Sequence, residues 1–355
     1  MDRMAYPKVA FRDRVIGGGS PTYIIAEVGT NHGGSLDRAK ELISLSARAG
    51  ADAVKFQSWK ADRIQNSKER TAEGKWVPST VLPVLQRYEV PREWHGILAE
   101  TCREEGVDFL STPFDVETAR LLRDTGVPAM KISSSDLVYD ELLEEVSGYG
   151  LPVFLSVGMA NLGEIERALT ILDRGGMPEV VLLHCIAMYP PRFEETNLRV
   201  IRTLREAFGL PVGFSDHFPG HEIDVAAVAL GACVIEKHVT LSREDGAPDS
   251  FYALEMDEFR RMVGAVRILE QAFGDGCKAC MPCEAGGLVH GRRSIYAARN
   301  LKAGSVLTRE DIAIVRPNLG ELKPRDWKQV IGARLMQDVQ TGCPLRWSDL
   351  EPRTS

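Results

Sequence analysis

Up to about residue 273, short apolar runs rich in β-forming residues alternate with longer segments whose apolar residues recur at helical spacing. Eight such runs are found, at residues 23–28, 53–57, 107–111, 128–132, 152–157, 180–185, 211–214 and 233–237. Residues 36–49 and 137–147 illustrate the helical spacing, and Ser35 and Gly50 are the expected caps of the first helix. Strand–helix alternation predicts right-handed crossovers and a parallel sheet. Eight units in roughly 250 residues fit a closed (β/α)8 TIM barrel better than an open doubly wound sheet.

The composition changes after this region. Residues 274–287 are rich in Gly, Cys and Pro, and residues 293–348 show short β-like runs, such as 294–297 and 313–316, separated by turns. We therefore predict a barrel domain at 1–275, a linker at 276–290 and a small, mostly β domain at 291–355.

Charge and hydropathy limit the partners that the chain is expected to have. The formal net charge of −7 argues against a nucleic-acid partner, because a phosphate backbone requires a concentrated cationic face. The first twenty residues carry charges throughout, and no later stretch has the length of a membrane span. With seven cysteines and no export signal, we expect a soluble cytoplasmic protein with free thiols.

In a TIM barrel the side chains at the carboxyl ends of the strands converge on one active site, here called the mouth. Many residues at these predicted positions are polar, which packing alone does not explain. They are Glu27 and the loop 29–34, Lys55, Gln57, residues 111–115, Lys131, Ser133, Ser134, Asp136, Ser156, His184, Tyr189, Ser215, Asp216, His217, Glu236, Lys237 and His238.

Two lysines in predicted strands indicate an anion site. An inward-facing lysine is costly to bury unless an anion or a carboxylate accompanies it. Lys55 and Lys131, with the hydroxyl groups of Thr112, Ser134 and Ser156, form a plausible pocket for phosphate and carboxylate together. The alternative is that each lysine pairs structurally with Glu27 or Asp136.

Two histidines follow or end neighbouring predicted strands. His217 and His238 could share one cation and leave coordination positions open for water and substrate. Imidazole ligands favour transition metals over Mg²⁺, and these residues leave Mn²⁺, Zn²⁺, Fe²⁺ and Co²⁺ open. The alternative for each histidine is a hydrogen-bonded structural role.

Three further thiols have a spacing seen in metal sites. Cys277, Cys280 and Cys283 lie in the predicted linker, and His290 is the nearest additional candidate ligand. A zinc or iron–sulfur site needs a fourth ligand and a fold around it. We interpret the three as incidental thiols of a flexible linker.

The ordered set of motifs resembles the sialic acid synthase family, which includes legionaminic and pseudaminic acid synthases. The matching stretches are IAEVGTNHGG at 25–34, VKFQ at 54–57, STPF at 111–114, KISS at 131–134, LSVGM at 155–159, GFSDH at 213–217 and IEKHVT at 235–240. The segment from Arg292 onward is similar to the antifreeze-like (SAF) domain of these enzymes. The resemblance covers nearly the whole chain.

The resemblance implies an enzyme that condenses phosphoenolpyruvate with an open-chain N-acylated amino-hexose, such as N-acetylmannosamine, in a domain-swapped homodimer. It implies a divalent metal on His217 and His238, with Mn²⁺ expected and Mg²⁺ or Co²⁺ as alternatives. Phosphoenolpyruvate would be bound by Lys55, Thr112, Lys131, Ser134 and Ser156. The sugar would be bound by Glu27, Gln57, Tyr189, Asp249 and the partner chain's Arg316, with Asp136 near it and Ser215 at the mouth. Glu27 is also the implied residue for proton transfer.

Three departures from the family pattern lie near the expected sugar. Ala187 stands where sialic acid synthases commonly have Asn, Ser134-Ser135-Asp136 replaces Ser-Gly-Glu, and Ser250 stands where many members have His. These departures leave the reaction class intact and the sugar open, including legionaminic- or pseudaminic-type and phosphorylated acceptors. A non-catalytic sugar- or anion-binding homologue is the alternative of a different class. A metal-dependent hydrolase barrel is disfavoured, since the first strand has no His-x-His pair.

Overall fold

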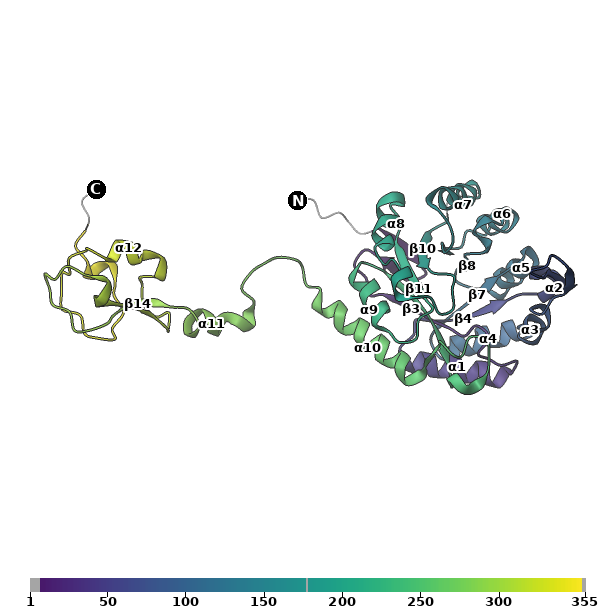
Figure 1. The fold of residues 1–355 in the computed structure, drawn as a ribbon, viewed down its shortest axis with the longest axis horizontal. Helices are drawn as coiled ribbons and strands as arrows, with labels where there is room; N and C mark the ends of the chain where they lie inside the picture. Colours follow the sequence, from purple (N-terminus) through teal and green to yellow (C-terminus); the bar gives the residue numbers. More distant parts are fainter. Residues whose placement is uncertain (1–6, 177, 353–355) are drawn as a thin grey trace. The chain divides into compact units, whose positions relative to one another are not determined.

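A computed structural model describes residues 7–176 and 178–352 of the chain. The chain divides into two compact units, Met1–Phe273 and Gly274–Ser355 (Figure 1). Within the described ranges, every helix is too short or too polar to cross a membrane.

The first unit is built on eight parallel strands. They are β3 (Tyr23–Glu27), β4 (Ala53–Ser58), β7 (Asp108–Pro113), β8 (Met130–Ile132), β9 (Val153–Ser156), β10 (Val180–Cys185), β11 (Val212–Asp216) and β12 (Val234–Thr240). The hydrogen-bonded order is β7-β4-β3-β12-β11-β10-β9-β8, and the two end strands, β7 and β8, lie next to each other. The predicted (β/α)8 barrel is therefore confirmed.

Helices connect the strands and surround them (Figure 1). They are α1 (Leu36–Ala49), α4 (Trp94–Glu104), α5 (Val116–Thr125), α6 (Asp140–Ser147), α7 (Leu162–Arg174), α8 (Val200–Phe208), α9 (Glu222–Ala229) and α10 (Met256–Ala272). The side chain of Ser35 caps the first turn of α1, and Gly50 ends it in the left-handed conformation, as predicted. The segment expected to be one helix at 137–147 is instead a 3-10 turn, Asp136–Val138, followed by α6.

The alternation of side chains along each strand separates two cores. Ile24 and Ala26 of β3 point outward and pack in a large cluster between the barrel and its helices. Tyr23 and Ile25 point inward and join a second cluster inside the barrel. The next inward residue along β3 is Glu27, which is also fully buried. The barrel interior is therefore apolar toward the amino ends of the strands and ionisable toward their carboxyl ends.

A hairpin closes the amino-terminal end of the barrel. Strands β1 (Lys8–Phe11) and β2 (Arg14–Gly17) pair antiparallel, and the ring of Phe11 contacts Tyr23 and Phe154 inside the barrel. Arg12 pairs with Asp108 at the start of β7. The sequence prediction did not include this hairpin.

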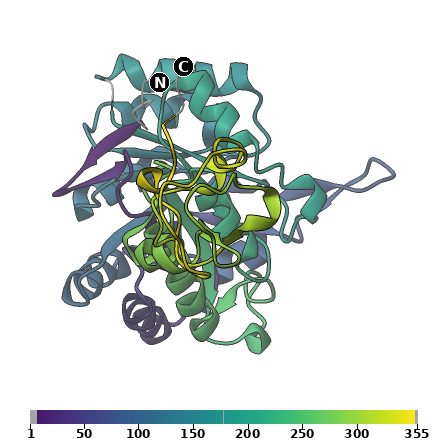
Figure 2. The same cartoon turned by 90° about the vertical axis from the view of Figure 1, so that its left-hand side faces the viewer.

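A second insertion follows β4. It contains α2 (Ala61–Ile64), the hairpin of β5 (Lys68–Arg70) and β6 (Trp76–Pro78), and α3 (Leu82–Arg87). Figure 2 shows this hairpin in blue-violet, extending away from the body of the barrel. Its strands are too short, and too exposed, to have been distinguished from a loop in the sequence.

The second unit has its own small core. It contains α11 (Ala285–His290), the antiparallel pair β14 (Ser294–Ala297) and β15 (Ile312–Val315), and α12 (Trp327–Val330), joined by turns and isolated bridges. Ile295, Leu322 and Leu345 are among its fully buried residues. Both predicted β-runs of this region are present as strands, the second beginning one residue earlier than expected.

Candidate active site

A polar cavity of about 330 Å³ lies at the carboxyl ends of the barrel strands. Seven of the eight strands, all but β3, contribute lining residues themselves or through the loops that follow them, as expected for the mouth of a TIM barrel. The cavity is lined by Lys55, Gln57, Thr112, Phe114, Lys131, Ser133, Ser134, Ser135, Ser156, Met159, Cys185, Ala187, Tyr189, Ser215, His217, Glu236 and His238.

Lys55 is the centre of a buried charged network. Its Nζ atom lies 2.5 Å from Glu27 Oε2 and 3.1 Å from Thr112 Oγ1. Gln57, on the same face of β4, donates to the other carboxylate oxygen of Glu27 at 2.9 Å. Burial raises the pKa of Glu27 to about 7, against the opposing effect of Lys55. The ion pair of Lys55 with Glu27, which was the structural alternative for this lysine, is therefore present, and Lys55 lines the cavity as well.

Glu236 connects the two lysines. The sequence analysis expected it at the mouth but assigned it no role. Its Oε1 atom lies 3.6 Å from Nζ of both Lys55 and Lys131 and accepts a hydrogen bond from Ser215. Its Oε2 atom is buried and has no hydrogen-bond partner among the described residues. Burial alone would raise the pKa of Glu236, but Lys131 and Lys55 lower it to about 2. This carboxylate balances the lysines and has one oxygen free for a further donor.

Lys131 is not matched by a close partner of its own. Its side chain is almost fully buried, and its Nζ atom lies 3.6 Å from Glu236 Oε1, which is long for an ion pair. Burial lowers the pKa of Lys131. Asp136, the structural partner considered for it, instead accepts a hydrogen bond from Ser133 at 2.6 Å. An incoming anion would relieve the incomplete pairing of this ammonium group.

Hydroxyl groups surround the two lysines. Ser134 accepts a hydrogen bond from the amide of Gly158 at 2.9 Å, and its Oγ atom lies 3.0 Å from Cys185 Sγ. A Cβ atom at position 158 would lie 2.8 Å from this sulfur, so glycine permits the close approach of the two loops. Ser156 lines the same cavity. The predicted anion-binding residues are thus brought together.

His217 and His238 lie side by side at the mouth, at the ends of the neighbouring strands β11 and β12. Their ring centroids are 5.6 Å apart, and the ring of Tyr189 lies 4.1 Å from that of His217, tilted by 40°. Nδ1 of His217 is held by the carbonyl of Ile186 at 2.8 Å, which leaves Nε2 as the free nitrogen. Burial lowers the pKa of both histidines to about 4, so both imidazoles are neutral at pH 7.

These properties fit a divalent transition metal. The two rings are neutral, adjacent and oriented by the protein, and Nδ1 of His238 is a buried nitrogen without a hydrogen-bond partner in the described residues. Over residues 7–176 and 178–352, no group of three or more His, Cys, Asp or Glu side chains is arranged to hold a metal ion. A metal here would have two protein ligands and would leave its other positions to water and substrate.

Glu27, Asp249 and Asp136, which were predicted to lie on the sugar side, do not line the cavity. Asp249 lies behind it, where its Oδ2 atom accepts bonds from the amide and hydroxyl of Thr30, both at 2.8 Å. Gly29 is required beside it, because a Cβ atom there would lie 2.4 Å from this carboxylate and 3.1 Å from His238. Asp136 is turned toward Ser133. Arg316 is exposed on the second unit.

Four residues expected at the mouth point away from the cavity. Outside the barrel, Ser111 bonds to another side chain and His184 bonds to a main-chain carbonyl. Asp216 and Lys237 bond to each other there. The strand period of two explains this correction, because each alternates with an inward-facing neighbour.

The outer part of the cavity is more exposed and more apolar. Tyr189 and Met159 both line it and are 49% and 73% exposed, whereas Lys55 and Lys131 are almost fully buried. Ala187 contributes a methyl group to this lining. The cavity therefore has a charged inner part and an open, partly apolar outer part.

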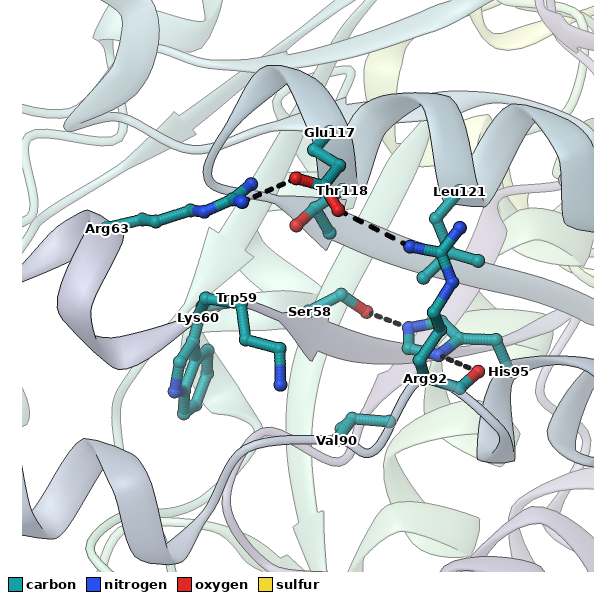
Figure 3. Close-up of a pocket in the computed structure, with 10 residues that line it drawn as sticks. All are labelled: Ser58, Trp59, Lys60, Arg63, Val90, Arg92, His95, Glu117, Thr118 and Leu121. Atoms are coloured by element: carbon teal, nitrogen blue, oxygen red, sulfur yellow. Dashed lines mark hydrogen bonds and ion pairs between the residues drawn. The ribbon is translucent and has the colours of Figure 1, made fainter.

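A second pocket, of about 40 Å³, lies outside the barrel between β4, α4 and α5 (Figure 3). Its cations are already paired: Arg63 and Arg92 with Glu117, and Lys60 with Glu89. His95 is buried and bonds to Ser58 at 2.7 Å (Figure 3). These contacts connect β4 to the neighbouring helices and give the pocket a packing role.

The thiols of the predicted linker belong to the second unit. Cys277, Cys280 and Cys283 are free and exposed in the second unit. Their interpretation as incidental thiols stays a prediction.

Comparisons with known proteins agree with the motifs. Residues 42–278 match the NeuB family, and residues 292–351 match the SAF domain. The chain is 39% identical to the N,N'-diacetyllegionaminic acid synthase of Campylobacter jejuni, covering 84% of this chain and 91% of that protein. It is 34% identical to a pseudaminic acid synthase of the same species, covering 92% and 96%.

A solved structure shows the same fold. The N-acetylneuraminic acid (sialic acid) synthetase of Leptospira borgpetersenii, in complex with citrate, superposes with a TM-score of 0.73 at 32% identity, covering 81% of this chain and 97% of that one. The chain therefore belongs to the NeuB family of sialic-acid-type synthases and carries a C-terminal SAF domain.

Proposed function

We propose that this protein condenses phosphoenolpyruvate with an open-chain N-acylated amino-hexose, giving a nine-carbon 2-keto sugar acid and inorganic phosphate. The observation that carries the proposal is the single cavity that holds both the buried pair Lys55 and Lys131 and the neutral pair His217 and His238. The first pair suits a dianionic or trianionic substrate, and the second suits a metal ion.

The proposed reaction forms one carbon–carbon bond and breaks one carbon–oxygen bond. The methylene carbon of phosphoenolpyruvate bonds to the aldehyde carbon, whose oxygen gains a proton. A water oxygen bonds to the former enol carbon and loses a proton. The bond from that carbon to the phosphate oxygen then breaks, which leaves a ketone and free phosphate.

The inner cavity supplies the anion site for this reaction. Lys55, Lys131, Thr112, Ser134 and Ser156 would hold phosphate and carboxylate and stabilise the charge that moves onto phosphate. Their hydrogen-bonding groups are fixed before substrate binds, for example by the 3.1 Å contact from Lys55 to Thr112.

Two further groups are proposed to take part, one on the aldehyde and one on the attacking water. A divalent metal held by His217 and His238, with Mn²⁺ expected and Mg²⁺ or Co²⁺ as alternatives, would polarise the aldehyde oxygen as a Lewis acid. Glu27, whose pKa burial raises to about 7, is suited to take the proton of the attacking water. Gln57 holds this carboxylate by a hydrogen bond of 2.9 Å.

The acceptor is proposed to bind in the outer cavity, near Gln57 and Tyr189. Ala187 offers no polar contact where sialic acid synthases commonly have Asn, and Asp136 is turned away from the cavity lining. These features, with the likeness to a legionaminic acid synthase, favour acceptors of the legionaminic or pseudaminic type as the alternative to N-acetylmannosamine.

The test is phosphate release from phosphoenolpyruvate and Mn²⁺ with a panel of acceptors: N-acetylmannosamine, its 6-phosphate and 2,4-diacetamido-2,4,6-trideoxy-hexoses. We expect release with at least one unphosphorylated acceptor and none without acceptor. Run in ¹⁸O-labelled water, the product should gain the label at C2 and the phosphate should not. Label in the phosphate, or no release with any acceptor, would contradict the proposal.

We further propose that a domain-swapped homodimer completes the site, with Arg316 from the second copy reaching the N-acyl group. Chains carrying Lys131→Met and chains carrying Arg316→Ala should each be impaired alone. Mixed and reassociated, they should recover about a quarter of wild-type activity, because half of the dimers would contain one intact site. Absence of recovery in verified mixed dimers would contradict the shared site.

A further inference from the structure

A cluster of three buried ionisable side chains lies on the outer side of the barrel, behind the cavity. Lys237 of β12 donates to Asp216 at the end of β11 and lies 3.1 Å from Asp224 in the first turn of α9. All three side chains are at most 1% exposed. None of them lines the cavity or has a part in the proposed reaction.

The place of this cluster in the chain links it to the two histidines. Asp216 directly precedes His217, and Lys237 directly precedes His238. Asp216 and Lys237 are also opposite each other in the register of the two parallel strands. Because side chains alternate along a strand, the cluster faces the helices while Glu236 and His238 face the cavity.

The ammonium group of Lys237 restrains the chain on both sides of His217. Besides its bond to Asp216, it donates to the main-chain carbonyl of Phe218 at 2.8 Å. The amide of Phe218 in turn donates to Asp216 Oδ1 at 3.1 Å. The backbone at residues 216–218 is thus tied to the strand that carries His238.

Such a cluster is not explained by stability alone. Replacing buried ion pairs by apolar residues of similar volume is often neutral or stabilising, so a buried lysine with two carboxyl groups favours a role in fixing geometry over one in stability. The geometry fixed here is the spacing of the two imidazoles, whose ring centroids lie 5.6 Å apart.

We propose that Lys237, Asp216 and Asp224 are positioning residues that hold His217 and His238 at the separation required to share one metal ion. The inference rests on the proposed metal-binding role of the histidines. It assigns to the cluster an effect on metal affinity that a residue acting only in folding would not have.

The experiment measures Mn²⁺ binding to the full-length protein without substrate, by the electron paramagnetic resonance signal of free Mn²⁺. Lys237→Met removes the ammonium group at similar volume. The matched control is Arg267→Met, which removes a cation that bonds to Asp52, Glu270 and the carbonyl of Thr22 at the opposite end of the same barrel. Urea unfolding of each variant gives the stability change.

We expect Lys237→Met to raise the dissociation constant for Mn²⁺ at least tenfold, and Arg267→Met to change it less than twofold at a comparable stability loss. Lys237→Arg, which keeps the charge, should recover most of the affinity. Should Lys237→Met fail to fold, Asp224→Asn carries the test, with an expected rise of several-fold.

Two outcomes separate this inference from the proposed function. Wild-type binding of one Mn²⁺ per chain, with unchanged affinity in the folded cluster variants, would overturn the positioning role and leave the proposed metal site standing. Absence of Mn²⁺ and Co²⁺ binding in the wild-type protein, with Co²⁺ followed by its visible absorption, would overturn both.

Discussion

Charged side chains are paired more completely at the amino-terminal end of the barrel than at the carboxyl end. At the amino-terminal end, the hairpin β1–β2 covers the strands, and Arg14, Arg267 and Glu270 pair with close partners at the border with solvent. At the carboxyl end, Lys131 has only a distant partner, and Glu236 and His238 each have a buried atom without a hydrogen bond among the described residues.

The difference indicates what each end is selected for. Complete pairing and an apolar filling stabilise the fold, whereas incomplete pairing in a cavity is retained where a ligand completes it. Changes at the mouth should therefore reduce activity with little loss of stability, and changes at the hairpin should do the opposite.

The largest expected effect is that of Lys131→Met. Loss of this ammonium group removes part of the proposed phosphoenolpyruvate site, and we expect kcat/KM for phosphoenolpyruvate to fall about 10³-fold or more. The free energy of unfolding should change little, because Glu236 keeps Lys55 and Ser215 as partners. Steady-state kinetics and urea unfolding measure the two quantities. A tenfold or smaller loss of kcat/KM would contradict the proposed anion site.

Phe11→Ala should show the reverse pattern. Phe11 is fully buried and its ring contacts Tyr23 and Phe154, so its truncation should lower the free energy of unfolding by about 3–5 kcal/mol. At temperatures where the variant is folded, kcat should stay within about twofold of wild type. A large loss of kcat in the folded variant would break the distinction between the two ends.

Glu27→Gln should change both turnover and the pH dependence of stability. The pKa of Glu27 is raised from 4.5 to about 7, so the native protein binds this proton more strongly than the unfolded chain does, and stability falls as pH rises from about 4.5 through 7. Gln at this position should remove up to about 3 kcal/mol of that decline. Urea unfolding at pH 5 and pH 8, compared between variant and wild type, measures it.

The same variant tests the proposed role in proton transfer. Phosphoenolpyruvate affinity should be kept, while turnover should fall about 10²- to 10⁴-fold. Near-normal phosphate release by Glu27→Gln would exclude this carboxylate as the proton acceptor.

The smallest effect is expected for Arg14→Met at the amino-terminal end. Its ion pair with Asp52 is 2.8 Å long, but the arginine side chain is 43% exposed and Asp52 also pairs with Arg267. The loss of stability should therefore stay below about 1 kcal/mol, with unchanged kcat. A larger loss would show that the paired charges at this end contribute more than solvent screening allows.

Much of the barrel follows from local sequence pattern. All eight strands were expected, and that at 180–185 has the observed bounds of β10. The same strand period places Lys55 and Gln57 on one face of β4, as the cavity requires. It also places Glu236, which was expected at the mouth without an assigned role, on the same face as His238, two residues later on the strand.

Other features are not local, and the sequence did not predict them. The hairpin β1–β2 has four-residue strands, and it is recognised as a plug only once Phe11 is seen against Phe154, far away in the chain. The pairing of Lys237 with Asp216 likewise depends on strand register. Sequence placed this lysine at the mouth, and the fold turns it outward.

The hairpin at the amino-terminal end also affects the order in which the two proposed substrates can bind. With the lower barrel filled by Phe11, Tyr23 and Phe154, both proposed substrates must come and go through one opening. The lysines lie deepest and Tyr189 lies at the rim, so an acceptor already in place would obstruct the donor. We therefore expect compulsory-order kinetics, with phosphoenolpyruvate first, and an acceptor analogue that inhibits uncompetitively toward it.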